Sequence, residues 1–325
     1  MAINLRGQRG TAVNEHKTRV AVLMGGVSSE REVSLRSGRG VAKALAGAGF
    51  EVIEAIVDTP DLACLSQVEA DVVFVALHGA FGEDGQVQAL LEEAGIAYTG
   101  SDPTASRAAM DKVESKKRFA AAGLQTPEYV VVRGAIDDAA AGSFKVRSGE
   151  MMVVKPAAEG SSIGVSIVNP DGLDAALEGA LSLGGTAIVE RYVPGREITV
   201  GVVGRQALPV IELRPHGAFF DYTAKYTKGQ TDYVVDPDLG EGVSLRAREA
   251  AMAAFDCLGC RDLSRVDMIF GRDGLLYVLE VNTIPGFTET SLVPMAAAAM
   301  GRDFATLCGD IVRMALARLA RAGTH

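Results

Sequence analysis

The chain has 325 residues, of which 48% are hydrophobic and 22% are charged, and this balance predicts a globular protein with more than one domain. Its formal net charge of -9 argues against sequence-independent binding of nucleic acid, which requires clustered lysine and arginine. No apolar run approaches the ~18 residues that cross a bilayer, and the first residues lack an apolar signal core. We therefore expect a cytoplasmic protein that binds neither nucleic acid nor membranes.

The first part of the chain alternates between strands and helices. Residues 1–18 precede the first periodic pattern, and we expect a flexible extension there. The stretch TRVAVLMGG, at 18–26, predicts a buried strand that ends in a glycine turn, and an amphipathic helical pattern follows it. Further strands and one helix are expected at 50–58, 70–79 and 83–95. This alternation predicts a parallel sheet, and we assign residues 19–102 to an N-terminal α/β domain.

The middle unit, residues 103–195, begins with a helical stretch that Pro103 opens and that extends to residue 123. The pattern then changes to short strands. Residues 134–150, rich in Ala, Asp, Gly and Ser, predict a variable surface connection. The expected strands are at 128–132, 151–156, 164–168 and 186–193.

The last unit, residues 196–325, begins in a strand pattern and ends in a helix over about 303–321. Between them we expect a loop region over 216–241 and a helix over 244–259. A β-hairpin follows over 264–283.

The hairpin has a turn signal in the sequence GRDG, and we place Phe270 opposite Leu275 on that basis. One face of the hairpin is then apolar throughout and must face the core. It carries Val266, Met268, Phe270, Leu275, Tyr277, Leu279 and Val281. The other face carries Arg265, Asp267, Ile269, Leu276, Val278, Glu280 and Asn282.

The polar side chains of the second face gather at the end away from the turn. In this register Arg265 lies opposite Glu280, and Asp267 is the diagonal neighbour of Glu280 at ~7 to 8 Å. A cross-strand ion pair with solvated neighbours would explain any one of these residues. However, carboxylate and amide oxygens are the ligands that Mg²⁺ prefers, and the rest of this face is too apolar for a solvated surface. We therefore favour a metal site at Asp267, Glu280 and Asn282.

A loop rich in glycine and serine follows Lys155, at Gly160–Gly164. Such a loop can bring N–H groups and hydroxyls to a phosphate, although loops of this composition are also ordinary turns. The spacing is not that of a P-loop, and no GxGxxG follows the first strand. Lys225 and Tyr226 lie in an irregular polar stretch, where solvent-exposed and functional roles are both open.

The four cysteines are Cys64, Cys257, Cys260 and Cys308, too few for a disulfide framework in a chain of this size. Cys257 and Cys260 form a CxxC pair, but a zinc site would need a second pair or nearby histidines. We interpret this pair as structural or incidental.

Eight stretches occur in this order: GGVSSEREVSLRSG, HGAFGEDG, MDK, VVKPAAEGSSIG, VERYVPGREITV, FFDYTAKY, SRVDMIF and LEVNTIPGFTETSLVPM. Together they resemble the motifs of the D-alanine–D-alanine ligase family in the ATP-grasp superfamily. The resemblance implies an α/β ATP-grasp fold. It implies a Rossmann-like parallel-sheet domain over 19–102, a central ATP-grasp subdomain over 103–195 and a C-terminal one over 196–325.

The resemblance also implies an ATP-dependent enzyme that joins two D-alanine molecules for peptidoglycan synthesis. ATP would phosphorylate the carboxylate of the first D-alanine, and the amine of the second would attack the acyl phosphate. Two Mg²⁺ ions, with Mn²⁺ as an alternative, and a homodimeric assembly are further implications.

The ATP contacts that the resemblance implies are charged residues, with lysines toward the phosphates and glutamates toward the adenine and ribose. They are Lys112, Lys155, Lys225, Glu190 and Glu197. The metal ligands that it implies are Asp267, Glu280 and Asn282, in agreement with the argument from the hairpin.

Other matches concern the reacting groups. Glu30 would receive the ammonium of the first D-alanine, with Ser161 and Tyr226 in a hydrogen-bonded link to it. Arg265 and the N–H of Gly286 would stabilise the oxyanion. Tyr226, where relatives that make D-alanyl-D-lactate have phenylalanine, resembles the dipeptide-forming ligases.

The second substrate would bind through its carboxylate to Ser291 and to the N–H of Leu292, with His78 nearby. From the residues alone, His78 is as well explained as a hydrogen-bonded histidine at a strand end. Glu30 is likewise consistent with an ordinary acidic first turn of a helix.

Three rival interpretations remain. A ligase of the same fold could use another acceptor, which an acceptor screen would decide. A nucleotide sensor without catalysis would be expected to lack metal or phosphate residues, and all of them are present. A nicotinamide-dependent oxidoreductase would need the missing GxGxxG.

Overall fold

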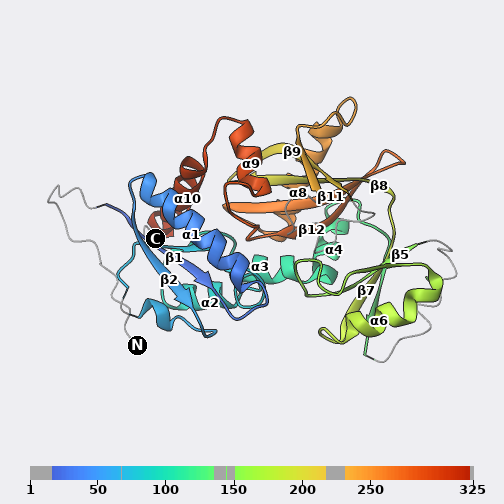
Figure 1. The fold of residues 1–325 in the computed structure, drawn as a ribbon, viewed down its shortest axis with the longest axis horizontal. Coiled ribbons are helices and arrows are strands. Elements are labelled where there is room, and N and C mark those ends of the chain that lie inside the picture. Colours follow the sequence, from blue (N-terminus) through green and yellow to red (C-terminus); the bar gives the residue numbers. More distant parts are fainter. Residues whose placement is uncertain (1–16, 67, 135–143, 145–150, 217–230, 323–325) are drawn as a thin grey trace.

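The structure, a computed structural model, describes residues 17–66, 68–134, 144, 151–216 and 231–322. The predicted extension and the predicted connection at 134–150 therefore lie almost wholly outside the described residues. The described chain forms three sheets, with the N-terminal sheet at one end of the long axis and the central sheet at the other (Figure 1).

The N-terminal sheet is parallel, as predicted, and has the strand order β2-β1-β3. Its elements are β1 (Arg19–Gly25), α1 (Arg31–Gly47), β2 (Glu51–Val57), η1 (Ala63–Leu65), β3 (Val72–Val75) and α2 (Gln86–Glu93). β1 is the central strand and is buried along nearly its whole length, which explains its unbroken apolar sequence. α1 packs closely on β1 at Gly38, where a Cβ atom would lie only 2.5 Å from the Cβ of Met24.

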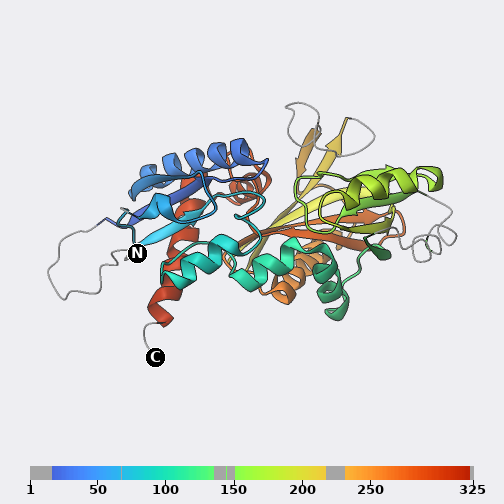
Figure 2. The same cartoon turned by 90° about the horizontal axis from the view of Figure 1, so that it is seen from below.

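The central unit begins with two helices and continues in an antiparallel sheet of order β4-β7-β5-β6, and a third helix, α6, covers one face of this sheet (Figure 2). Its elements are α3 (Pro103–Met110), α4 (Lys112–Ala121), β4 (Tyr129–Arg133), β5 (Met152–Pro156), β6 (Ser166–Val168), η2 (Pro170–Gly172), α6 (Leu173–Leu181) and β7 (Thr186–Arg191). The stretch predicted as one helical segment is two helices. Asp111 separates them, because its extended backbone ends α3 and its side chain caps α4.

The C-terminal unit is built on an antiparallel sheet of order β10-β9-β8-β11-β12, with α8 packed against it. Its elements are β8 (Gly195–Val203), β9 (Gln206–Pro215), β10 (Thr231–Val235), α8 (Val243–Leu258), β11 (Leu263–Gly271), β12 (Leu276–Asn282), α9 (Leu292–Ala299) and α10 (Phe304–Ala322). β10 corrects the prediction that 216–241 is all loop. It is a five-residue edge strand whose side chains are mostly only partly buried, so its sequence pattern is weak.

The β11–β12 hairpin has a different register from the predicted one. Arg265 lies opposite Asn282, and Asp267 lies opposite Glu280. The pairing shifts at a β-bulge just beyond Asp267, so that Phe270 lies opposite Leu276. The predicted pairs of Arg265 with Glu280 and of Phe270 with Leu275 are therefore wrong.

The bulge also changes which β12 side chains face the core. Val278 is buried in one cluster with Val266 and Met268, whereas Leu279 lines the cleft on the other face. The prediction had these two β12 residues the other way round. At the polar end of the hairpin, on the side of the bulge away from the turn, the side chains lie on the face that was predicted for them.

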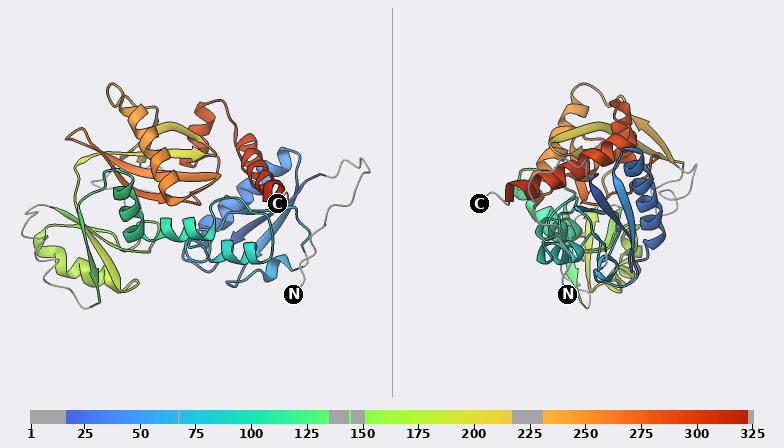
Figure 3. Two further views of the ribbon diagram at one scale, coloured as in Figure 1. Left: turned by 180° about the vertical axis from the view of Figure 1, so that it is seen from behind. Right: turned by 90° about the vertical axis from the view of Figure 1, so that its left-hand side faces the viewer.

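The chain returns to its N-terminal unit after the hairpin. α10 lies beside α1, and its residues Leu307 and Ile311 share a core with Val20 and Val41 (Figure 3). The N-terminal and C-terminal units therefore meet in one hydrophobic core, and the domain boundaries stay predictions. No helix among the described residues is long and apolar enough to cross a membrane.

Candidate active site

A cleft of about 1430 Å³ lies between the three units. Every predicted site residue in the described part of the chain lines it. These residues are Glu30, His78, Lys112, Lys155, Ser161, Glu190, Glu197, Arg265, Asp267, Glu280, Asn282, Gly286, Ser291 and Leu292. Lys225 and Tyr226 lie outside the described residues. The fold thus gathers residues that are far apart in the sequence, while their individual roles stay predictions.

The polar end of the hairpin forms one hydrogen-bonded cluster around Asp267. The guanidinium of Arg265 donates to both carboxylate oxygens, at 2.8 and 2.7 Å. Thr199 donates its hydroxyl at 2.6 Å, and Asn282 donates its amide at 3.0 Å. Thr199 lies on β8 opposite Asp267 and was not predicted, because a buried threonine fits an apolar strand. Asp267 is therefore held in one orientation from three sides.

This cluster has the donor set of a magnesium site. Glu280 lies opposite Asp267, and its side chain is 31% exposed. Asn282 uses its amide nitrogen toward Asp267, which leaves the amide oxygen for a ligand. Among the described residues, no three His, Cys, Asp or Glu side chains gather in a metal-binding arrangement. Two carboxylates and an amide fit an ion that completes its coordination with water and substrate phosphate.

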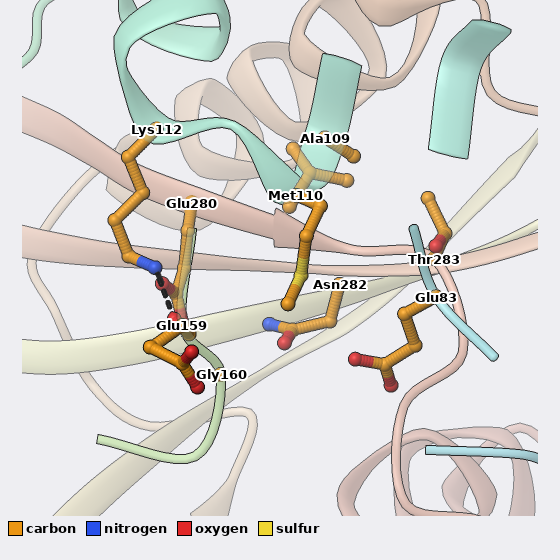
Figure 4. Close-up of a pocket in the computed structure, with 10 residues that line it drawn as sticks. Glu83, Ala109, Met110, Lys112, Glu159, Gly160, Glu280, Asn282 and Thr283 are labelled. Atoms are coloured by element: carbon orange, nitrogen blue, oxygen red, sulfur yellow. Dashed lines mark hydrogen bonds and ion pairs between the residues drawn. The ribbon is translucent and has the colours of Figure 1, made fainter. Parts of the chain in front are cut away.

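Lys112 extends to the same part of the cleft from the start of α4 (Figure 4). Its Nζ donates to the backbone oxygen of Glu159 and lies 3.9 Å from Oε2 of Glu280. Burial lowers the pKa of Lys112, and the charge of Glu280 only partly opposes this effect. A phosphate bound here would offset the cost of burying the ammonium.

Glu190 on β7 is buried between two lysines. Its Oε1 lies 2.8 Å from Nζ of Lys155 on β5 and 2.8 Å from Nζ of Lys116 on α4. Burial opposes ionisation of Glu190, but the two ammonium groups outweigh it and hold its pKa below the ordinary value. Burial lowers the pKa of Lys116 to about 8. Lys116 was not predicted, because a lysine beside Lys117 on a helix normally indicates a solvated face.

The loop after β5 reaches across to the N-terminal unit. The hydroxyl of Ser161 donates to Oε1 of Glu30, which precedes α1. Ser161 and Ser162 have φ angles of 50° and 59°, in the left-handed region that serine rarely adopts. Backbone strain of this kind gathers at ligand-binding segments. This contact joins the central and N-terminal units at the predicted ammonium site.

The segment between β12 and α9 carries the remaining predicted contacts. Ser291 is the N-cap residue of α9, and its Oγ accepts a hydrogen bond from the N–H of Thr288 at 2.9 Å. A Cβ atom at Gly286 would lie 3.7 Å from this Oγ, so Gly286 and Ser291 are neighbours. The N–H of Leu292 belongs to the first turn of α9, where N–H groups lack helical acceptors and favour an anion.

His78 follows β3 and is almost fully buried. Its Nδ1 lies 3.0 Å from the oxygen of Ile284 and 3.3 Å from Oε1 of Glu83, and its Nε2 lies 3.1 Å from Oγ of Ser37. Burial raises the pKa of Glu83, although the hydrogen bond with His78 opposes this. Ser37 and Glu83 were not predicted as site residues, since Ser37 lies in a helical pattern and Glu83 begins the helix that was expected at 83–95.

At the rim of the cleft, Glu212 on β9 forms an ion pair with two arginines. Arg196 donates to both of its oxygens, at 2.6 and 2.7 Å, and Arg214 donates twice to one of them, at 2.9 and 2.7 Å. Arg196 directly precedes Glu197, which the family resemblance predicts to contact ATP. The ion pair therefore ties β8 to β9 beside a predicted ATP contact.

The sequence matches two family models. They are the D-ala D-ala ligase N-terminus, over residues 61–101, and the D-ala D-ala ligase C-terminus, over residues 119–313. A D-alanine--D-alanine ligase of Anaeromyxobacter sp. strain K is 49% identical over 298 residues, which are 90% of this chain and 96% of the relative.

Solved structures show the same fold. A D-alanine--D-alanine ligase of Bacillus anthracis, complexed with ATP, is 32% identical with a TM-score of 0.81, over 94% of this chain and 100% of the other. The VanG D-Ala:D-Ser ligase of Enterococcus faecalis is 28% identical with the same TM-score of 0.81, over 92% of this chain and 100% of the other.

The C-terminal family model alone matches more than half of the chain, and the relative from Anaeromyxobacter is similar over nearly its full length. The cleft in turn is lined by the predicted site residues in the described part of the chain. The chain belongs to the D-alanine–D-alanine ligase family and has its ATP-grasp fold.

Proposed function

We propose that this protein joins two D-alanine molecules into D-alanyl-D-alanine for peptidoglycan synthesis and converts ATP into ADP and phosphate. A carboxylate oxygen of the first D-alanine attacks the γ-phosphorus of ATP and expels ADP. The amine of the second D-alanine then attacks the acyl carbon, loses a proton and displaces phosphate. The observation that best supports this is the Arg265–Asp267 cluster on the same cleft as buried Lys112 and Lys155.

ATP binds between the central and C-terminal sheets in this proposal. Lys112 and Lys155 contact its phosphates together with Lys225, which lies outside the described residues. Glu190 and Glu197 bind the adenine and ribose. Lys155 and Lys116 keep Glu190 ionised, so that it accepts hydrogen bonds and does not donate them.

Asp267, Glu280 and Asn282 hold the two Mg²⁺ ions that we infer, and Mn²⁺ has similar ligand preferences. When bound, these ions neutralise charge on the transferred phosphoryl group. The chain itself fixes Asp267 through Arg265, Thr199 and Asn282, so this carboxylate needs no reorganisation when ATP enters.

The substrates occupy the side of the cleft toward the N-terminal unit. Glu30 receives the ammonium of the first D-alanine, and Ser161 links it to Tyr226, which lies outside the described residues. Ser291 and the N–H of Leu292 hold the carboxylate of the second D-alanine. His78 lies close to the second substrate.

Two groups stabilise the tetrahedral oxyanion, the Arg265 guanidinium and the N–H of Gly286. Arg265 is buried, so its charge acts at short range with little screening by water. The Ser161 loop closes over the site because an acyl phosphate hydrolyses readily and water must be excluded before it forms.

We infer that the enzyme works in the cytoplasm as a homodimer, without nucleic acid or membrane partners. Residues 19–102 form the N-terminal domain, and 103–195 and 196–325 form the two ATP-grasp subdomains. The net charge of -9 supports the absence of nucleic acid.

An acceptor screen tests the proposal. ADP release would be measured with ATP, Mg²⁺ and D-alanine, alone or with excess D-serine or D-lactate, and with L-alanine. We expect ADP release only when D-alanine is present and a dipeptide of two D-alanines as the main product by mass. A mixed product with D-serine would move the assignment toward the activity that the VanG name describes. If the protein binds ATP but no amino acid stimulates ADP release, the result would favour a nucleotide sensor without catalysis.

A further inference from the structure

The hydrogen bonds of His78 define its tautomer. The carbonyl oxygen of Ile284 can only accept, so Nδ1, at 3.0 Å, must carry a proton. In the neutral ring Nε2 is then an acceptor, and the Ser37 hydroxyl at 3.1 Å must be its donor. Glu83 lies 3.3 Å from Nδ1 and is a second acceptor for the same proton.

Ser37 uses its hydroxyl in two directions. While it donates to His78, its oxygen accepts a hydrogen bond from the backbone N–H of Phe287, at 3.3 Å. His78 and Ser37 therefore bind two peptide groups that flank Pro285 and Gly286. The first is the carbonyl of Ile284, and the second is the N–H of Phe287.

The side chains on both sides of this turn are anchored as well. Ile284 is buried in a cluster with Leu77 and Phe81, two residues that lie close to His78 in the sequence. The ring of Phe287 packs against Phe74, with centroids 6.0 Å apart, and against Phe304, at 5.5 Å. The turn is thus fixed to the N-terminal unit, although it belongs to the C-terminal one.

We propose that Ser37 is a positioning residue for the oxyanion turn, acting through the tautomer of His78 and the N–H of Phe287. The peptide that carries the Gly286 N–H lies between the two peptides that are held, so its direction is set by them. The inference rests on the proposed function in giving the Gly286 N–H a role toward the oxyanion. It also makes His78 a support of the turn and not an acceptor of the substrate proton, since protein groups occupy both ring nitrogens.

Ser34 provides a matched control on the same helix. It is fully buried, accepts a hydrogen bond from Gly25 N–H at 2.9 Å and donates to the oxygen of Ala76 at 2.7 Å. It does not line the cleft and has no bond to the turn. Ser34→Ala and Ser37→Ala each remove a buried hydroxyl with two bonds, so a purely structural cost would be similar in both.

The experiment combines a spectroscopic and a kinetic readout on the full chain. Histidine labelled with ¹⁵N reports the protonation of each ring nitrogen, and the chain has only four histidines. His78→Gln identifies the signal of His78. Kinetics would give kcat and the KM values for ATP and D-alanine in wild type, Ser37→Ala and Ser34→Ala.

We expect wild-type His78 to carry its proton on Nδ1, with an unprotonated, hydrogen-bonded Nε2. Ser37→Ala should change the Nε2 signal and lower kcat by about 10- to 100-fold, because small displacements of catalytic groups have effects of this size. Its KM for ATP should stay within about twofold, since the turn is not an ATP contact. Ser34→Ala should keep kcat near the wild-type value.

A wild-type His78 with its proton on Nε2 would overturn the inference, even if Ser37→Ala does not fold. So would an unchanged kcat in Ser37→Ala, or an equal loss of kcat in Ser34→Ala. If wild type shows no ADP release with D-alanine, the proposed function fails instead. The ¹⁵N signals would still decide the hydrogen bonds of His78 in that case.

Discussion

Arg265 and Asp267 lie two residues apart on β11, point to the same face and share two hydrogen bonds, at 2.8 and 2.7 Å. The planar guanidinium matches both oxygens of the carboxylate, which a lysine ammonium cannot do. One contact therefore orients a predicted metal ligand and an oxyanion-stabilising cation together. The two side chains are largely buried, and the pairing offsets the cost of burying two charged groups.

Arg265→Lys should therefore damage catalysis despite conserving the charge. We expect kcat to fall by about 10²- to 10³-fold, the usual effect of losing one oxyanion donor. The measurement is steady-state ADP release with saturating ATP and D-alanine. Arg272→Lys, at the tip of the same hairpin, is the control and should retain activity. A kcat within twofold of wild type in Arg265→Lys would contradict this role.

Glu280→Gln should weaken the response to magnesium, because an amide replaces one of the two carboxylates of the proposed metal site. We expect at least about a 10²-fold loss of kcat at low Mg²⁺, since metal ions supply several kcal/mol of transition-state stabilisation. A titration of ADP release with Mg²⁺ measures this. Asp273→Asn, at the exposed tip of the hairpin, should give the wild-type titration. Identical curves for Glu280→Gln and wild type would remove Glu280 from the metal site.

Lys116→Met should destabilise the protein, because it removes one of the two cations that offset the burial of Glu190. We expect a loss of about 3 kcal/mol in the free energy of unfolding, the low end of the range for breaking a buried ion pair, since Lys155 remains. Urea unfolding gives this value. Lys117→Met, on the exposed side of α4, should change stability by less than about 0.5 kcal/mol. Equal effects of the two substitutions would show that the buried contact contributes nothing.

Glu212 predicts a dependence of stability on pH. Hydrogen bonds from Arg196, and then from Arg214, outweigh burial and hold the pKa of Glu212 below its ordinary value of 4.5. A carboxylate with a lowered pKa in the folded state stabilises the protein above pH 4.5, and this contribution is lost as pH falls through the folded-state pKa.

Glu212→Gln should therefore lower the free energy of unfolding by about 1 to 3 kcal/mol near neutral pH, the range for hydrogen bonds to a charged group. The difference from wild type should shrink as the pH falls below 4.5. Urea unfolding between pH 3 and pH 7 would measure it. A difference that grows toward acid pH would mean that the pKa is raised instead.

The hairpin illustrates what the sequence could predict. Its polar end was predicted from alternation alone, because Glu280 and Asn282 interrupt an apolar strand with period two. The register was wrong because the Asp-Gly signal predicts a tight turn that ends before Leu275. In the structure Leu275 belongs to a wider loop, in which the N–H of Gly271 donates to the backbone oxygen of Leu275, at 2.9 Å. The β-bulge is a second source of error, since one extra residue leaves no distinct sequence signal.

The supporting residues of the cleft could not be predicted for a different reason. Lys116 and Lys117 are neighbouring lysines, and the sequence does not show which of them is buried. The packing of α4 against β7 buries Lys116 and leaves Lys117 exposed. Ser37 and Thr199 are small hydroxyl residues that occur in any helix or strand. Their roles depend on contacts that are distant in the sequence. Ser37 meets Phe287 only when the N-terminal and C-terminal units come together, and Thr199 meets Asp267 only when β8 pairs with β11.

The oxygen atoms of the product test the central claim, ligation through an acyl phosphate, most directly. D-alanine labelled with ¹⁸O in its carboxylate would be supplied with ATP and Mg²⁺, and the released phosphate would be examined by mass spectrometry. If the carboxylate attacks the γ-phosphorus, each phosphate carries one ¹⁸O atom for every dipeptide formed. Phosphate without ¹⁸O, formed together with dipeptide, would contradict the acyl phosphate and the assignment of the cleft that depends on it.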